Sequence, residues 1–556
     1  MSEPLEEAVA ARLDNWAAER VAERLWERDG SLWAESGHPP ADVAAWLGWL
    51  DLPDTMSRRV GEIRNVAAGV ARDGYRRAAV LGMGGSSLAP ELCASVFDGP
   101  TDLRVCDSTH PDAMRGFRSW ATGARTLLCV SSKSGTTTET LSFHASLADV
   151  VPALDFVAIT DPGTPLAELA RAQEFRAIVE GEPSVGGRFS ALSVFGLIPT
   201  ALRGADMEAM LEEARAMAAA CRLPPDSNPG LRLGAAIGEA ALAGRDKLTL
   251  LTTPRLASLG DWVEQLVAES TGKAGRGVIP IVGEPAAPAE QYRADRCFVV
   301  VSLDEEPTSA ELAQRAAELR DAGHPVHEMR LGRPESVGAE FVRWEVAIAA
   351  LGIVLGVDPF DQPNVAEAKA ATEALLDEYR REGALRTPMP VVAEPGLAAW
   401  ADPAALGDAP PTVAAAVRSL LESMAEGDYF AILAYVPPDP PVKAALERIR
   451  ASVRDALGAA TTAGIGPRYL HSTGQLHKGG PDSGVYLMLT ADPMRDLPIP
   501  GRVETFGTLI AAQAAGDLAA LQGRGRRVLR LHAAGAEAGL ARVTQLVGEA
   551  LGSPVA

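Results

Sequence analysis

The sequence has no long hydrophobic run. Its longest apolar stretch, residues 346–357, is shorter than the roughly 20 residues that a membrane-spanning helix needs. Residues 1–19 are acidic and amphipathic, without the basic start and apolar core of a secretion signal. We therefore expect a cytoplasmic protein that does not associate with a membrane.

The chain also has fewer basic than acidic residues. The chain has 52 lysine and arginine residues against 73 aspartate and glutamate residues, and its formal net charge is -21. Because binding to a phosphate backbone needs a basic surface, we predict no nucleic-acid partner. An anionic small molecule is still compatible with this charge, since a local pocket of cations and helix N-termini can overcome the field of the whole chain.

Cysteine is scarce and unpatterned. The five cysteines are an odd number, and no two of them form a Cys-x-x-Cys pair, which argues against a disulfide framework. Most lie in apolar segments, so we expect buried free thiols in a reducing compartment. The five are Cys93, Cys106, Cys129, Cys221 and Cys297.

The chain of 556 residues is too long for a single hydrophobic core. Short apolar strands alternate with helices in two successive series, a pattern typical of parallel sheets covered on both faces. The predicted fold class is therefore α/β. Five parts are expected, namely an N-terminal helical segment over 1–72, a first parallel-sheet subdomain over 73–243, a second over 244–382, a linker rich in Pro, Ala and Gly over 383–412, and a smaller C-terminal α/β domain over 413–556.

The expected elements follow from the same periodicity. One N-terminal helix is predicted over 5–28. Strands are predicted in the first subdomain over 78–82, 103–107, 127–130, 156–160 and 175–179, in the second over 248–252, 297–302 and 325–330, and in the C-terminal domain over 430–436, 485–489 and 528–531.

The stretch from Thr126 to Thr140 carries the strongest chemical signal. Its apolar strand ends at Val130, and six of the next eight residues have hydroxyl side chains before a helix begins near Glu139. Hydroxyls and free backbone N–H groups at the positive end of a helix suit a phosphate dianion, and Lys133 adds one charge. Ser and Thr here could instead only cap the helix, but six hydroxyls exceed what a cap requires.

A second loop, residues 82–87, also follows a strand and precedes a helix, the place where ligands bind in parallel sheets. Its glycines allow the backbone to approach a ligand, and Ser86 can donate a hydrogen bond. The loop is similar to a dinucleotide-binding loop only superficially, because the third glycine of that pattern would fall at Ser87. We therefore expect no NAD.

Arg188 and Glu269 are candidates for catalysis. Arg188 stands in Gly-Gly-Arg-Phe-Ser, where its planar fork could stabilise an oxyanion or simply lie at the surface. Glu269 lies one helical turn after Gln265, near the end of a helix at Gly272. Such a glutamate is either solvated or, in a partly buried cleft, a base for a carbon-bound proton.

Gln362 and Lys369 are a further pair of polar candidates. Gln362 stands in Phe-Asp-Gln-Pro, and Lys369 follows it by seven residues. Along a helix, residues at that spacing face the same way and could hold sugar hydroxyls. The alternative is a capped helix with a surface lysine.

Together these segments resemble the phosphoglucose isomerase family and its sugar isomerase (SIS) domains. The family patterns are a Gly-Gly-Ser loop, a Ser-Lys-x-x-x-Thr phosphate loop, Gly-Gly-Arg-[Phe/Tyr]-Ser, Glu-Ser-x-Gly-Lys, and Phe-Asp-Gln with a lysine seven residues after the Gln. All five occur here in family order over residues 75–382. The resemblance implies two SIS-type α/β/α subdomains, with the C-terminal α/β domain and the N-terminal helical segment as additions.

The resemblance also implies an activity. It implies an aldose–ketose isomerase of glycolysis and gluconeogenesis that interconverts glucose 6-phosphate and fructose 6-phosphate through a cis-enediol, as a homodimer without metal or nucleotide cofactor. Glu269 would move the proton between C1 and C2, Arg188 would stabilise the developing charge, and Lys369 would assist at the ring oxygen. The implied substrate-binding residues are Ser86, Ser132, Lys133, Ser134, Thr137, Thr140 and Gln362.

The resemblance is incomplete at one catalytic position. The family's ring-opening histidine usually lies between the Glu and Phe-Asp-Gln segments, but here Gly-Glu-Pro at 283–285 lacks the Gly-Gln-His continuation. The chain also continues past the usual family end, with a histidine-rich loop at 468–480 that resembles the C-terminal region of transaldolase and phosphoglucose isomerase fusion proteins. We expect His477, or alternatively His471, to replace the missing group. Both histidines could instead have a structural role. Metal binding is not expected, because no nearby Cys or Glu would complete a set of ligands.

Other functions stay open at this point. The chain could be an isomerase that also accepts mannose 6-phosphate, because the contacts that select at C2 cannot be read from sequence. It could also be a phosphosugar sensor without activity, although a sensor would not need Glu269. Transaldolase activity would need a Schiff-base lysine in a barrel, for which the C-terminal part is too short.

Overall fold

The structure is a computed structural model that describes residues 3–385, 388–401 and 412–552. The chain forms two compact units, each assembled from segments that are distant in sequence. Unit 1 consists of Met1–Asp107, Trp120–Val282 and Ala294–Asp361. Unit 2 consists of Ser108–Ser119, Gly283–Arg293 and Gln362–Ala556. Helix α6 (Pro111–Thr122) carries the chain from unit 2 back into unit 1.

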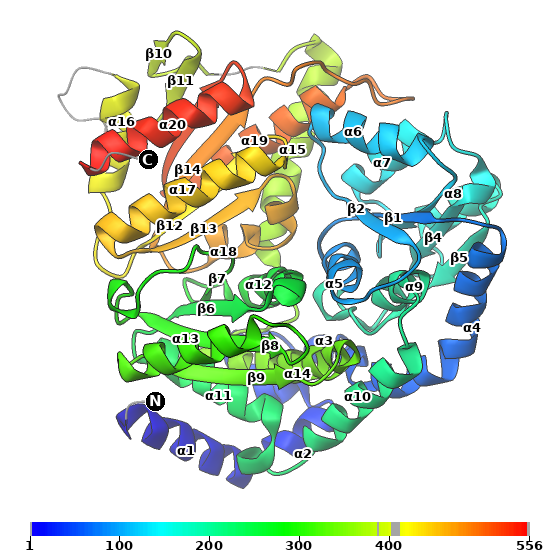
Figure 1. The fold of residues 1–556 in the computed structure, drawn as a ribbon, viewed down its shortest axis with the longest axis vertical. Helices are drawn as coiled ribbons and strands as arrows, with labels where there is room; N and C mark the ends of the chain where they lie inside the picture. The colour runs from blue at the N-terminus through cyan, green and yellow to red at the C-terminus, as the bar shows by residue number, and fades with distance from the viewer. Residues whose placement is uncertain (1–2, 386–387, 402–411, 553–556) are drawn as a thin grey trace. The chain divides into compact units, whose positions relative to one another are not determined.

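The N-terminal part of unit 1 is helical, as expected (Figure 1). Its helices are α1 (Glu3–Ala18), α2 (Val21–Trp26), α3 (Pro40–Ala44) and α4 (Leu52–Arg72). The prediction of one helix over 5–28 was wrong. Arg20 adopts a left-handed conformation with φ 55°, so the chain turns between α1 and α2.

A five-stranded parallel sheet forms the first α/β layer of unit 1, in the order β2-β1-β3-β4-β5. Its strands are β1 (Arg77–Leu81), β2 (Asp102–Cys106), β3 (Thr126–Ser131), β4 (Phe156–Thr160) and β5 (Ala177–Glu180). Helices cover both faces (Figure 1), namely α5 (Leu88–Val96) and α9 (Val194–Arg203) on one and α7 (Thr138–Leu147) and α8 (Pro165–Ala172) on the other. The predicted strands are confirmed to within two residues.

A second parallel sheet in unit 1 has the order β7-β6-β8-β9. Its strands are β6 (Lys247–Thr252), β7 (Ile279–Ile281), β8 (Arg296–Leu303) and β9 (Val326–Leu331). Strand β7 was not predicted from the sequence, because it is three residues long, contains a proline and lies at the edge of the sheet. The helices of this second part of unit 1 are α10 (Met207–Ala220), α11 (Pro229–Leu242), α12 (Ala257–Thr271), α13 (Ser309–Asp321) and α14 (Val337–Leu355).

Unit 2 is built on a six-stranded sheet in the order β10-β11-β15-β14-β12-β13. Its four C-terminal strands are parallel, whereas β10 and β11 form an antiparallel hairpin at one edge. The strands are β10 (Val392–Glu394), β11 (Leu397–Trp400), β12 (Tyr429–Tyr435), β13 (Ala460–Ile465), β14 (Gly484–Ala491) and β15 (Arg527–Ala533). The hairpin lies in the segment 383–412 that was expected to be a linker, and residues 402–411 of that segment lie outside the described residues.

The helices of unit 2 are α15 (Pro363–Glu382), α16 (Val413–Glu422), α17 (Pro440–Leu457), α18 (Gly474–Gly479), α19 (Phe506–Gly523) and α20 (Ala536–Leu551). Within the described ranges of both units, no helix is long and apolar enough to cross a membrane. All five cysteines are buried and outside any disulfide, which confirms the expectation of buried thiols.

Candidate active site

Two glycine turns in unit 1 are in direct contact. The turns Gly84–Ser86, after β1, and Gly187–Phe189 come from the Gly-Gly-Ser and Gly-Gly-Arg motifs. A Cβ added to Gly85 would lie 1.9 Å from the carbonyl oxygen of Gly187, so only glycine fits at this position. The turns thereby bring buried Ser86 close to the segment that carries Arg188.

The hydroxyl loop between β3 and α7 is held by its own side chains. Ser132 Oγ lies 2.8 Å from Thr137 Oγ1 and also accepts a hydrogen bond from the N–H of Gly135 at 3.1 Å. Gly135 has φ 68°, a conformation that favours glycine at the tip of the turn. Ser134 Oγ lies 3.0 Å from Thr136 Oγ1 on the exposed side of the loop.

The hydroxyls of this loop do not act as a helix cap. Thr137 is the residue before α7, but its side chain makes no capping hydrogen bond. In the first turn of α7, Thr140 is fully buried, and its hydroxyl has no hydrogen-bond partner in the described part of the chain. The helix start therefore retains hydrogen-bonding capacity that a phosphate could use.

Lys133 makes a different contact from the one its position suggests. Its ammonium pairs with the carboxylate of Asp161 and donates to the carbonyl oxygen of Glu182 at 3.0 Å. The positive charge of Lys133 is thus compensated inside the protein. In this arrangement the loop offers hydroxyls and backbone N–H groups rather than an uncompensated ammonium.

Arg188 and Glu269 meet in the interior of unit 1. Arg188 Nη1 lies 3.3 Å from Glu269 Oε2, and the exposed fractions of the two residues are 3% and 7%. Arg188 Nε also donates to Ser270 Oγ at 2.8 Å, and Gln265 Nε2 donates to Glu269 Oε2 at 3.4 Å. Burial lowers the pKa of Arg188. The structure thus brings together the two residues predicted for proton transfer and charge stabilisation.

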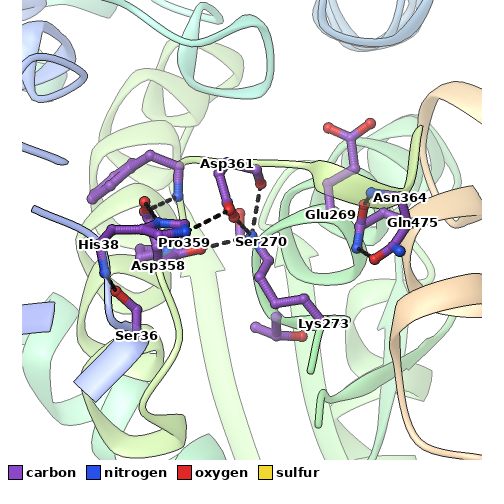
Figure 2. Close-up of polar contacts among 12 residues, drawn as sticks. Ser36, His38, Glu269, Ser270, Lys273, Asp358, Pro359, Asp361, Asn364 and Gln475 are labelled. Atoms are coloured by element: carbon purple, nitrogen blue, oxygen red, sulfur yellow. Dashed lines mark hydrogen bonds and ion pairs between the residues drawn. The ribbon is translucent and has the colours of Figure 1, made fainter. Parts of the chain in front are cut away.

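The loop between α14 and α15 fixes the other end of Arg188. Arg188 Nη2 donates to the carbonyl oxygens of Pro359 and Asp361 at 2.7 and 2.8 Å. Lys273 Nζ donates to the carbonyl oxygens of Asp358 and Asp361, each at 2.6 Å, and extends toward the latter in Figure 2. Burial lowers the pKa of Lys273 to about 8. We assigned no role to Lys273 or Asp358 from the sequence, although Lys273 stands in the Glu-Ser-x-Gly-Lys motif.

Gln362 and Lys369 belong to unit 2, and both are exposed. Gln362 precedes α15 with φ -149°, so the helical repeat does not set the direction of its side chain. The helix start is held by a pair of amides shown in Figure 2: Gln475 Nε2 donates to Asn364 Oδ1 at 2.7 Å, and the N–H of Asn364 donates to Gln475 Oε1 at 2.8 Å. The histidine-rich loop therefore contacts the start of α15 through Gln475.

His477 lies inside unit 2, with 2% of its surface exposed. Its ring packs between Tyr469 and Tyr486 at centroid distances of 5.9 and 5.2 Å. Burial lowers the pKa of His477 well below its ordinary value, so the ring is neutral at pH 7. His471, by contrast, is only partly buried.

The Gly-Glu-Pro segment, where the family histidine was expected, is bound to the C-terminal sheet within unit 2. Glu284 Oε1 accepts hydrogen bonds from the N–H and hydroxyl of Thr461 on β13, at 2.8 and 2.9 Å. Arg450 on α17 donates to the carbonyl oxygen of Gly283 at 2.7 Å. The loop 468–480 begins shortly after the end of β13. The strand that binds the Gly-Glu-Pro segment therefore also leads into the loop that carries His471 and His477.

Comparison with known proteins identifies the family. No protein-family model matches the chain. The probable glucose-6-phosphate isomerase of Haloarcula marismortui, however, is 31% identical over 338 residues, which cover 53% of this chain and 77% of that protein. The chain belongs to the glucose-6-phosphate isomerase family. The glucose-6-phosphate isomerase of Rubrobacter xylanophilus is 28% identical over 415 residues, or 64% of this chain and 93% of that protein.

Two solved structures share the fold of this chain. A hypothetical protein of Thermus thermophilus superposes with a TM-score of 0.54 at 26% identity, over 65% of this chain and 98% of that one. A glucose-6-phosphate isomerase of Chlamydia trachomatis shares the fold with a TM-score of 0.54 at 18% identity, over 68% and 87% of the two chains. The family resemblance and the α/β fold class predicted from the motifs are confirmed.

Proposed function

We propose that this chain interconverts glucose 6-phosphate and fructose 6-phosphate through a cis-enediol intermediate. The observation that carries the proposal is the contact between Arg188 and Glu269, a carboxylate beside a fixed guanidinium in a buried setting. Membership of the glucose-6-phosphate isomerase family supports the same substrate pair. The enzyme would act in the cytoplasm, in glycolysis and gluconeogenesis, as a homodimer.

The proposed chemistry divides between the two side chains. Glu269 takes the proton from C2 of the open-chain aldose and returns it to C1, while the hydroxyl proton on O2 passes to O1, so that the carbonyl group moves from C1 to C2. Arg188 stabilises the negative charge that develops on oxygen when the proton leaves carbon. Because Arg188 is held by two backbone carbonyls and Ser270, it needs little reorganisation when that charge appears.

The proposed phosphate site is the hydroxyl loop, with Ser86 contacting the sugar. Ser132, Ser134 and Thr137 would supply hydroxyls, Lys133 its backbone N–H, and Thr140 the hydroxyl that has no partner within the described residues. Gln362 and Lys369 would hold the sugar, with Lys369 assisting at the ring oxygen.

Replacing Thr140 with valine tests this phosphate site. Because the Thr140 hydroxyl has no partner in the described part of the protein, the melting temperature should stay unchanged. The KM for glucose 6-phosphate should rise about 10- to 100-fold, since a hydrogen bond to a charged group contributes about 1.5–3 kcal/mol. Thr544→Val, which removes a hydroxyl bonded to Leu540 within α20, is the matched control and should leave KM unchanged. An unaltered KM in Thr140→Val would remove Thr140 from the site.

The ring-opening step is proposed for His477, or alternatively His471. The support is positional, since the family segment at 283–285 lacks its histidine and is bound by the strand that precedes the histidine-rich loop. The His477→Asn enzyme should lose more rate on cyclic glucose 6-phosphate than on an open-chain analogue, because only the cyclic sugar must be opened. His471→Asn serves as the comparison. Equal losses on both substrates would count against a ring-opening role for His477.

The proposed activity is tested by incubating the purified protein with glucose 6-phosphate and with mannose 6-phosphate in parallel and following fructose 6-phosphate. Formation of fructose 6-phosphate from the glucose ester supports the proposal. Turnover of both esters would extend the substrate range. Tight binding of a phosphosugar without turnover would replace the enzyme proposal with a sensor.

A further inference from the structure

His38 lies against the loop that holds Arg188. Its Nδ1 is 2.9 Å from Asp358 Oδ2, and its Nε2 is 3.7 Å from Asp361 Oδ2 (Figure 2). The carbonyl oxygen of Asp361 is one of the two that accept hydrogen bonds from Arg188 Nη2. The imidazole therefore spans both carboxylates of a four-residue segment whose backbone fixes the guanidinium.

The segment that carries His38 is firmly attached to this part of unit 1. Trp33 is 1% exposed, and its Nε1 donates to the carbonyl oxygen of Ala349 on α14 at 2.9 Å. The ring of Trp33 also meets Phe360 edge-on, with centroids 5.1 Å apart. Ser36 Oγ accepts a hydrogen bond from the N–H of His38 at 3.3 Å. The histidine is thus presented from an anchored turn, although its side chain is 43% exposed.

The charges around the loop favour a protonated ring. Two cations and three carboxylates meet there, namely Arg188, Lys273, Glu269, Asp358 and Asp361. A neutral His38 would leave one negative charge uncompensated, whereas an imidazolium balances the cluster.

The geometry also argues against a metal ion at these residues. Both ring nitrogens face a carboxylate, one at hydrogen-bond distance and the other at ion-pair distance, an arrangement that suits a charged imidazolium. A metal ion would use a single ring nitrogen, and it would have to approach a carboxylate, Asp361, that is already paired with the ammonium of Lys273.

We propose that protonated His38 is a positioning residue for catalysis: by bridging Asp358 and Asp361 it fixes the loop whose carbonyl oxygens orient Arg188 toward Glu269. This inference rests on the proposed isomerase function. It assigns a role to the N-terminal helical segment, in which the sequence motifs indicated no chemistry. His38 does not touch the reacting atoms.

The bridge predicts a defined pH dependence. The hydrogen bond to Asp358 raises the pKa of His38 above its ordinary value of 6.5, with burial opposing this, Asp361 adding to it and Lys273 acting against it. Since the folded-state pKa is raised, the stabilisation is complete below pH 6.5 and is lost as pH rises through the folded-state pKa. The ordering of the loop, and with it kcat, should decline over the same interval.

The first test is a titration of the histidine ring signals by NMR, with His38 assigned from the spectrum of His38→Gln. The wild-type His38 should titrate above 6.5, and Asp358→Asn should move its pKa back toward that value. Titration at the ordinary value in both proteins would overturn the bridge. A shift of the His38 signals by micromolar Zn²⁺ would also overturn it, in favour of a metal site. The titration requires no enzymatic activity.

The second test is kinetic. His38→Gln should lower kcat about 5- to 30-fold, with KM changed less than about twofold, because the substrate contacts are intact while Arg188 is less well placed. His38→Arg keeps the positive charge and should recover most of kcat. His532→Gln, which removes a histidine contact with Asp492 in unit 2, is the control and should leave kcat unchanged. A wild-type kcat in His38→Gln, or no recovery in His38→Arg, would refute the positioning role.

The two proposals fail in different ways. If the wild-type protein does not isomerise glucose 6-phosphate, the proposed function is rejected and the positioning role is rejected with it. The NMR titration would still decide whether His38 bridges the two carboxylates. If the enzyme is active and His38→Gln is as fast as wild type, the function stands and only the role of His38 is lost.

Discussion

Glu269→Gln is expected to lower kcat for glucose 6-phosphate by about 10²- to 10⁴-fold, the range typical of general acid–base catalysis. The amide has nearly the same shape as the carboxylate and can still contact Arg188 and Gln265, but it cannot accept a proton from carbon. KM should change little, because the phosphate contacts lie on other elements. Initial rates at saturating substrate measure the effect.

Two controls test whether the loss of kcat in Glu269→Gln comes from removing the catalytic base. Glu264→Gln makes the same substitution on the same helix, α12, and should leave kcat within about twofold of wild type. Circular dichroism melting should show that Glu269→Gln folds normally. Near-normal isomerisation by a folded Glu269→Gln enzyme would remove Glu269 from catalysis and leave the Arg188 contact as a structural ion pair.

Much of the site in unit 1 could be predicted because its residues lie in short motifs fixed by local chemistry. The hydroxyl loop combines a strand end, a glycine at positive φ and a helix start within a few residues, and each part is readable from composition. Arg188 and Glu269 were also assigned from local motifs. Their contact could not be derived from either motif alone, because it joins residues that are 81 positions apart.

The residues that were missed act through partners far away in the chain. Lys273 and Asp361 belong to the Glu-Ser-x-Gly-Lys and Phe-Asp-Gln motifs. Neither motif shows by itself that the two side chains form an ion pair. His38 precedes Asp358 by 320 positions, and its surroundings in sequence resemble an ordinary helix entry. Conversely, Lys133 looked like a phosphate ligand from its neighbours, and the structure pairs it with Asp161.

The missed strands have a similar explanation. β10 and β11 are only three and four residues long, and they form a hairpin next to β15, which comes more than a hundred residues later in the chain. β13 is rich in Ala, Thr and Gly, so it lacks the apolar run that marked its neighbours in the sheet. Pairing to β12 along its whole length, rather than its own composition, makes it a strand.

Lys478→Met is expected to destabilise unit 2 by about 3–5 kcal/mol, the usual cost of leaving one partner of a buried ion pair without the other. Lys478 Nζ lies 2.5 Å from Asp517 Oδ1, and both side chains are 1% exposed. Tyr469 donates to the second oxygen of Asp517 at 2.5 Å, but a phenol does not supply a compensating charge. Urea unfolding followed by circular dichroism, with amide hydrogen exchange in β12 and β14, measures the loss.

The double variant Lys478→Met with Asp517→Leu separates charge from packing. If the single variant is unstable because it leaves a buried carboxylate unpaired, replacing that carboxylate with an apolar side chain should recover most of the lost stability. Lys443→Met, at an exposed position on α17, is the matched control and should change stability by less than about 0.5 kcal/mol. A double variant no more stable than Lys478→Met would show that the lysine acts through its contacts in α18, where it also donates to the carbonyl oxygen of Gly474 at 3.2 Å, rather than through its charge.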